Sequence, residues 1–99
     1  MKDFNLLDFL PEGRGRHITS RELEDITHLK GTEIRAEVNR LRTAGVPIAS
    51  DGNGYYIATT EEELTATIRN LQSRRNAMER AILGLMEAKF NFEFGGERQ

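Results

Sequence analysis

Residues 32–57, TEIRAEVNRLRTAGVPIASDGNGYYI, decide the fold of this chain, because their hydrophobic pattern changes from helical to extended. Ile34, Val38 and Leu41 recur at spacings of four and three, which places them on one stripe of a helix. Gly45 follows, and glycine often ends a helix in the left-handed conformation. The stretch therefore predicts a helix over about 32–44.

A β-hairpin is predicted directly after this helix. Val46, Ile48, Tyr56 and Ile57 flank residues 51–54 (DGNG), which tolerate the positive φ angles of tight turns. A phosphate loop is excluded, because no Lys-Ser or Lys-Thr closes the glycine pattern. A calcium loop is disfavoured, since tyrosines occupy a ligand place and the turn place. A wing that touches DNA and a plain structural hairpin remain.

The segment before residue 32 predicts two further helices. An apolar cluster in residues 4–10, ended by a proline, predicts a first helix of two or three turns. Residues 17–19 predict a very short strand. The next helix is expected to begin at Thr19 or Ser20, where an N-cap precedes acids. Its expected buried residues are Leu23 and Ile26.

A long helix is predicted over about 60–89, because a capping sequence precedes it and no glycine or proline appears until Gly84. Arg75 interrupts its apolar seam of Leu64, Ile68, Leu71, Met78, Ile82 and Leu85. The first three are expected to pack on the preceding domain. A homodimer is expected through Met78, Ile82, Leu85 and Met86, with the direction of pairing left open.

Composition indicates one compact domain, since 99 residues are too few for two independent cores. The expected fold class is mainly α with a small β-hairpin, organised as a helix-turn-helix domain over 1–58, a long helix over 59–89 and a tail over 90–99. The tail contains Phe90, Phe92 and Phe94, which favour docking on the core or on a partner. No signal peptide is recognisable, so a cytoplasmic location is expected.

The sequence offers little for catalysis or metal binding. Cysteine is absent, which excludes disulfides and thiolate chemistry. His17 and His28 have no carboxylates at ligand spacing, and nothing arranges Ser20, His28 and Asp25 as a catalytic triad. We expect no enzyme activity, no cofactor, no metal, no small-molecule ligand and no membrane partner.

The order of expected elements is that of a winged helix-turn-helix followed by an extra C-terminal helix. Residues 18–58, ITSRELEDITHLKGTEIRAEVNRLRTAGVPIASDGNGYYIA, resemble the winged-helix DNA-binding domain found at the front of biotin repressors and in many bacterial and phage regulators. The resemblance is most specific from residue 34 to residue 57, with the pattern R..V..LR..G and a wing ending in GY.I. The continuation TTEEEL...I..L.SR is similar to the tail of small phage or prophage DNA-binding proteins.

This resemblance implies that residues 32–43 enter the major groove and that 50–55 form a wing against the DNA backbone. The expected base contacts are Thr32, Ala36, Asn39 and Arg40. The expected backbone contacts are Arg21, Lys30, Arg35, Arg42, Gly52, Asn53, Gly54 and Tyr55. The implied function is sequence-specific binding of double-stranded DNA by a homodimeric transcriptional regulator.

Two observations favour a different function. The net charge of the chain is -2, whereas phosphate contacts normally call for a basic face. Glu33 and Glu37 also flank the expected groove-facing surface, so that surface could be an ordinary solvated one. The alternative is a winged-helix protein-interaction or assembly module, for example a phage replication or assembly factor that does not read DNA.

Overall fold

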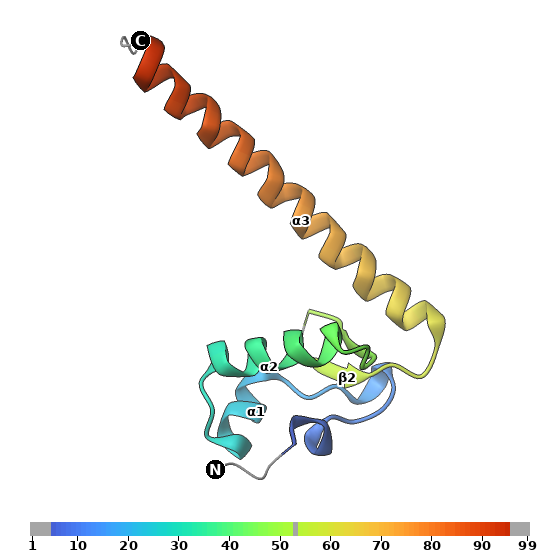
Figure 1. Ribbon diagram of the computed structural model, residues 1–99. Coiled ribbons are helices and arrows are strands. Elements are labelled where there is room, and N and C mark those ends of the chain that lie inside the picture. The colour runs from blue at the N-terminus through green and yellow to red at the C-terminus, as the bar shows by residue number, and fades with distance from the viewer. Residues whose placement is uncertain (1–4, 53, 96–99) are drawn as a thin grey trace. The chain divides into compact units, whose positions relative to one another are not determined.

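The computed structural model describes residues 5–52 and 54–95, and the wing contact predicted for Asn53 lies outside them. The chain forms two compact units that divide between Thr67 and Ile68. The elements are η1 (Leu6–Phe9), η2 (Arg14–Arg16), α1 (Ser20–Thr27), α2 (Gly31–Thr43), β1 (Ile48–Ser50), β2 (Tyr55–Ile57), α3 (Glu61–Phe90) and the π-helical turn η3 (Asn91–Gly95), as Figure 1 shows. The predicted class, mainly helical with a small antiparallel hairpin and a long C-terminal helix, is confirmed.

The N-terminal apolar cluster forms one short 3-10 turn, η1, so the predicted helix of two or three turns is wrong. Asn5 begins the turn, since its side-chain Oδ1 accepts the N–H of Leu7 at 3.0 Å. Leu10 already has an extended backbone, as is usual for a residue that precedes proline. The cap at Asn5 and the extended Leu10 leave only four residues for the turn. The side chains of Leu6 and Leu10 are nevertheless buried.

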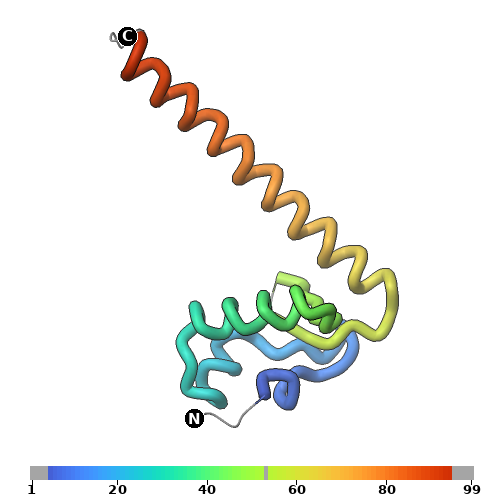
Figure 2. Tube along the Cα trace, viewed as in Figure 1, coloured from blue at the N-terminus to red at the C-terminus, as the bar shows by residue number. Residues whose placement is uncertain are grey.

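The segment predicted as a very short strand forms a single antiparallel bridge to β2, which Figure 2 lets the reader follow. The N–H of Ile18 donates to the carbonyl of Tyr55 at 2.9 Å, and the N–H of Tyr55 donates to the carbonyl of Ile18 at 2.8 Å. A second bridge joins Glu12 to Ile57. β2 therefore has β1 along one edge and the segment before α1 along the other.

α1 begins with the predicted cap. Thr19 Oγ1 accepts the N–H of Glu22 at 3.0 Å, and the Glu22 carboxylate accepts the N–H of Thr19 at 2.9 Å. Leu23 is buried, but Ile26 is 48% exposed, so the predicted burial of Ile26 is wrong. Thr27 lies four positions after Leu23, and its hydroxyl donates to the Leu23 carbonyl at 2.6 Å. Because Thr27 is half-buried, the buried side of this short helix runs from Leu23 to Thr27 and not to Ile26.

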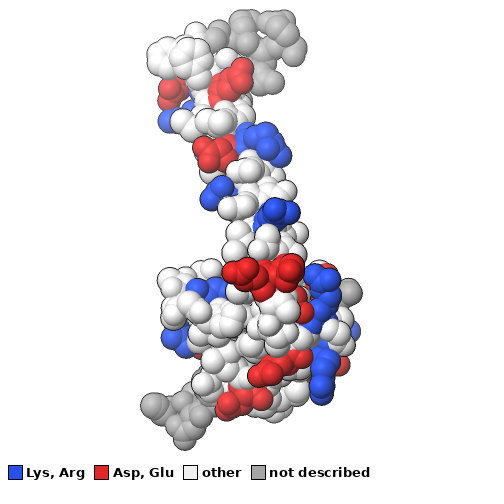
Figure 3. All heavy atoms as spheres, turned by 90° about the vertical axis from the view of Figure 1, so that its right-hand side faces the viewer, with Lys and Arg blue, Asp and Glu red and all other residues white. Residues whose placement is uncertain are grey.

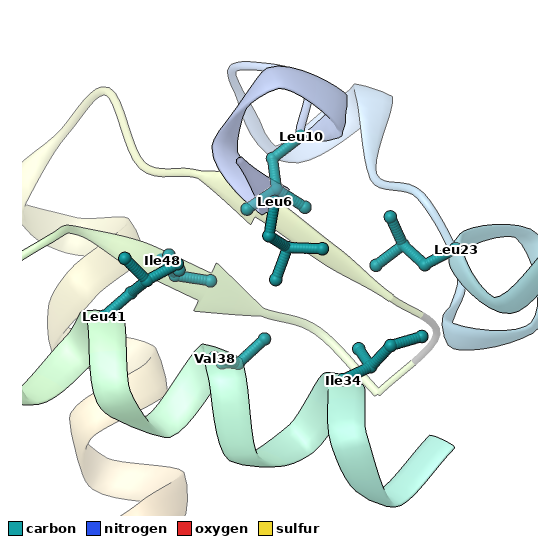
Figure 4. Close-up of a cluster of buried hydrophobic side chains, with 7 residues drawn as sticks. All are labelled: Leu6, Leu10, Leu23, Ile34, Val38, Leu41 and Ile48. Carbon is teal, nitrogen blue, oxygen red and sulfur yellow. The ribbon is translucent and has the colours of Figure 1, made fainter. Parts of the chain in front are cut away.

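The core of the first unit lies between α2, α1, the N-terminal turn and the hairpin. Figure 4 shows seven of its side chains converging from these elements: Leu6, Leu10, Leu23, Ile34, Val38, Leu41 and Ile48. The predicted helical stripe of α2 is therefore confirmed as its buried side. Tyr56 is also buried, which confirms that one of the two adjacent tyrosines belongs to the core. Gly45 has a φ of 94° and ends the helix as expected.

The first two turns of α3 are tied to the first unit by polar contacts. Thr67 is 4% exposed, and its hydroxyl accepts the N–H of Ser50 at 3.1 Å and donates to the Ser50 carbonyl at 3.3 Å. Glu63 accepts the N–H groups of Thr59 at 2.8 Å and of Arg14 at 3.2 Å. The start of α3, up to Thr67, therefore belongs to the first unit and lies beside the hairpin and η2. No helix in the described part of the chain is both long and apolar enough to cross a membrane.

Acid is expected to weaken this junction through Glu63. The backbone N–H of Thr59, helped by that of Arg14, lowers the pKa of Glu63 below its ordinary value of 4.5. A carboxylate with a lower pKa in the folded state stabilises the fold above its unfolded pKa, and that contribution is lost as the pH falls through the folded pKa. We therefore expect the urea midpoint to fall as the pH drops below about 4.5, and to fall less in Glu63→Gln.

The neighbouring substitution Glu62→Gln is the matched control, because Glu62 lies on the same turn and is exposed. Its acid dependence should equal that of the unsubstituted protein. Equal curves for Glu63→Gln and Glu62→Gln would contradict the role given to Glu63.

Candidate nucleic-acid interface

The outer face of α2 consists of small and polar side chains. Thr32, Ala36 and Asn39, three of the four predicted base contacts, are exposed there, while the opposite stripe of the helix fills the core. Thr43 continues this face, and its hydroxyl is bonded to the carbonyl of Asn39 at 2.9 Å. A helix whose outer face carries short side chains can approach base edges in a major groove without a steric barrier. We call Thr32, Ala36 and Asn39 the outer face of α2.

Arg40, the fourth predicted base contact, is exposed but already paired. Its Nη2 lies 2.6 Å from Glu37 Oε2, and its Nε donates to Glu37 Oε1 at 3.1 Å. The hydrogen bond and charge of Glu37 raise the pKa of Arg40 above its ordinary value. Reading guanine would require this exposed bidentate pair to open first.

Arg42 is half-buried and joins α2 to the hairpin. Its Nε donates to the carbonyl of Ile48 at 2.9 Å, and its Nη2 donates to Ser50 Oγ at 3.3 Å. The predicted phosphate contact would compete with both bonds. The contacts therefore assign Arg42 a role in positioning β1 against α2.

Three other cations predicted to contact phosphates are exposed: Arg21, Lys30 and Arg35. Arg21 lies on the first turn of α1, Lys30 precedes α2, and Arg35 flanks the outer face of α2. Within residues 5–52 and 54–95, the guanidinium groups of Arg21 and Arg35 take part in no hydrogen bond or ion pair. These two groups are available to an external anion.

The tip of the hairpin, residues 51–54, is less suited to phosphate than the sequence indicates. The N–H of Gly54 donates to Asp51 Oδ1 at 3.2 Å, so this amide is already used by a carboxylate. Asp51 Oδ2 also lies 3.1 Å from His17 Nδ1. Gly52 is exposed with a φ of 92°, whereas the half-buried Tyr55 pairs with Ile18. Gly52 keeps the best access to a DNA backbone among the described tip residues.

Arg16 is a candidate contact that sequence reasoning missed. It is exposed, and its segment lies beside β2, where Ile18 pairs with Tyr55. Its guanidinium takes part in no hydrogen bond or ion pair in the part of the chain that the structure describes. The basic sequence Arg14-Gly15-Arg16 ahead of a short strand was the available signal, because pairing of that strand would bring Arg16 to the hairpin.

The four residues predicted to form a dimer interface all lie on α3. Met78, Ile82, Leu85 and Met86 are between 56% and 71% exposed. On the face drawn in Figure 3, charged side chains of both signs lie along α3 with uncharged atoms between them. A helix with such an uncovered apolar seam is suited to pairing with another helix.

Among the described residues, no three histidine or acidic side chains come close enough together to hold a metal ion. Comparisons of the chain with models of protein families, with curated proteins and with solved structures give no match.

Proposed function

We propose that this protein is a sequence-specific double-stranded DNA-binding protein that acts by occupying a DNA site and not by chemistry. The outer face of α2 is the observation that carries the proposal. The turn after α1 leads into a helix whose buried stripe is fixed in the core. Thr32, Ala36 and Asn39 stand exposed on the other side of this helix, beside Arg35, which has no partner among the described residues. This is the arrangement by which a second helix of a helix-turn-helix enters the major groove.

The residues on this face divide into base and backbone contacts. The amide of Asn39 can bind the N6 and N7 edge of adenine, and the methyl groups of Thr32 and Ala36 can contact a thymine methyl. Arg35 and Arg21 supply charge for phosphates, which positions the helix without reading sequence. Arg16 and Gly52 extend the backbone contacts toward the hairpin.

A regulator of transcription working as a homodimer is the form of this function that fits the chain best. Two copies would present two α2 helices to half-sites about one turn of DNA apart, roughly 34 Å. Doubling the interface also offsets the small number of available cations, since Arg40 and Arg42 have partners within the chain.

A protein-interaction module is the second candidate. Asp51 favours it, because a carboxylate occupies the hairpin tip and takes the amide that a phosphate would use. The acidic side chains of Glu33 and Glu37 beside the outer face of α2 also favour a protein-interaction module. The two candidates differ in one measurable property, since only DNA binding is driven by release of counterions.

The Asn39→Ala variant is expected to lose base discrimination. The preferred site is first obtained by selecting tightly bound duplexes from a random pool with the unsubstituted protein. On that site, the substitution should weaken binding by about 1–3 kcal/mol and relax the preference at one base pair. Binding to random duplex should change little.

Asn70→Ala is the matched control, because Asn70 is an exposed asparagine on α3 outside the proposed interface. Its site preference should equal that of the unsubstituted protein. Failure to enrich any sequence, or equal preferences in Asn39→Ala and Asn70→Ala, would contradict readout by the outer face of α2.

A further inference from the structure

α3 carries an apolar seam whose side chains are exposed. Its members between the second and seventh turns of the helix are 38% to 71% exposed and are Ile68, Leu71, Met78, Ile82 and Leu85. They alternate between the a and d positions of a heptad repeat, in which Arg75 occupies an a position. A single charged residue within such a seam selects which pairings of the helix are acceptable.

Parallel pairing of two copies would place Arg75 directly against its own copy. In a parallel pair each a residue faces the same a residue of the partner, so two guanidinium groups would meet inside the seam. Parallel pairing would also bring Arg74 beside the partner's Glu79, but that pair lies at the solvated edge, where ion pairs contribute little. Charge repulsion within the seam therefore disfavours the parallel arrangement.

Antiparallel pairing removes this conflict, because each a residue then faces a d residue. With the twofold axis between Asn76 and Ala77, Ile68 faces the partner's Leu85 and Leu71 faces the partner's Ile82. Both layers are apolar on either side. Arg75 faces the partner's Met78, whose flexible side chain leaves room for a guanidinium.

The charges agree with the same register. Glu79 occupies an e position, and positions a and e lie on the same side of an antiparallel seam. Because Arg75 faces the partner's Met78, it lies next to the partner's Glu79, one residue further along the helix. A shift by one heptad toward the C-terminus would bring Glu79 opposite the partner's Glu79 and leave residues 61–69 without a paired helix. The opposite shift would set Glu61 against the partner's Leu85.

We propose that α3 pairs with α3 of a second copy as an antiparallel two-stranded coil whose axis passes between Asn76 and Ala77. The inference rests on the proposed homodimer and specifies its direction and register. It pairs residues 68–85 of α3 with the same residues of the partner's α3, so each end of this stretch lies beside the opposite end of its partner.

Cysteine pairing tests this arrangement, because the chain contains no cysteine of its own. Leu71→Cys and Ile82→Cys are prepared separately in the full chain and oxidised alone and as an equal mixture. The thiols should link only in the mixture, where residue 71 of one copy faces residue 82 of the other. Ser73→Cys, on the outward side of α3, is the control and should not link with itself or with either variant.

Each alternative gives a distinct result by mass spectrometry of the linked products. Self-linked Leu71→Cys and self-linked Ile82→Cys would show parallel pairing and overturn the inference. A monomer mass by light scattering with no linked product would overturn it as well. DNA binding is measured on the same samples, so loss of the DNA signal with a linked mixture would reject the DNA-binding proposal and leave the antiparallel pair standing.

Discussion

The Gly54→Ala variant is expected to lose about 3–5 kcal/mol of unfolding free energy, the upper end of single-substitution effects. A methyl group at residue 54 would collide with the Ile18 carbonyl oxygen, and it would lie 2.7 Å from the carbonyl carbon and 3.0 Å from Thr19 N. These are backbone atoms of the segment paired with β2, so they cannot move aside as a side chain would. Relief of the collision would break the Ile18–Tyr55 bridge and displace the cap of α1.

Urea unfolding followed by tyrosine fluorescence measures this effect locally, because the chain has no tryptophan and its two tyrosines, Tyr55 and Tyr56, both lie in β2. Gly84→Ala is the control. No atom lies within 4 Å of its added methyl, and alanine replaces glycine inside a helix with a gain of about 1 kcal/mol. A Gly54→Ala midpoint equal to that of the unsubstituted protein would contradict the close approach.

Leu6→Ala is the second large effect, with an expected loss of about 2–5 kcal/mol. The Leu6 side chain has no exposed surface and contacts the core formed by α1, α2 and the hairpin, although it comes from a turn of only four residues. Removing it leaves a cavity among Leu23, Ile34 and Ile48, which cannot close without moving whole elements. A domain of this size has a total stability of about 5–15 kcal/mol, so the loss is a large fraction of the stability and should lower the urea midpoint strongly.

Ile26→Ala is the matched comparison for Leu6→Ala. It removes a side chain of the same size that is 48% exposed, so its effect should stay well below that of Leu6→Ala. The same tyrosine-detected urea curves serve both variants. Equal losses would mean that η1 is not part of the core.

The elements with a strong repeat were predictable from the sequence. The stripe of Ile34, Val38 and Leu41 fixed α2 and its buried side, and the glycines on either side of Asn53 marked the hairpin turn. The start of α3 was also predictable, because Thr60 and Glu63 form a recognisable cap. These patterns are predictable because helix periodicity, turn glycines and helix caps each act on residues that are close in the sequence.

The errors have both local and tertiary causes. The apolar residues of the N-terminal cluster predict a helix, but Asn5 and the residue before Pro11 restrict it to one turn. The sequence places Ile26 in the core with Leu23, but a helix of eight residues has too few positions to define which side is buried. The sequence indicates a turn residue at Gly54, and the structure shows that this glycine also allows the backbone of Ile18 to approach.

The sequence was enough to predict which residues form the candidate interface, but not which of their side chains are already bonded within the chain. The sequence identified the outer face of α2, yet it gave no sign that Glu37 binds Arg40 or that the Ile48 carbonyl binds Arg42. Such pairings depend on side-chain conformations that composition does not specify. They redirect the expected DNA contacts toward Arg35, Arg21 and Arg16, whose guanidinium groups make no hydrogen bond or ion pair in residues 5–52 and 54–95.

DNA binding through α2 is best tested by a fluorescence-anisotropy titration of the protein against random duplex DNA over a range of salt concentrations. We expect an affinity that falls steeply with salt, and a slope of log affinity against log salt concentration that is smaller by about 1 in Arg35→Ala. Arg80→Ala removes the same charge from the exposed surface of α3 and should keep the original slope. Absence of binding at low salt, or equal slopes for Arg35→Ala and the unsubstituted protein, would contradict DNA binding through α2.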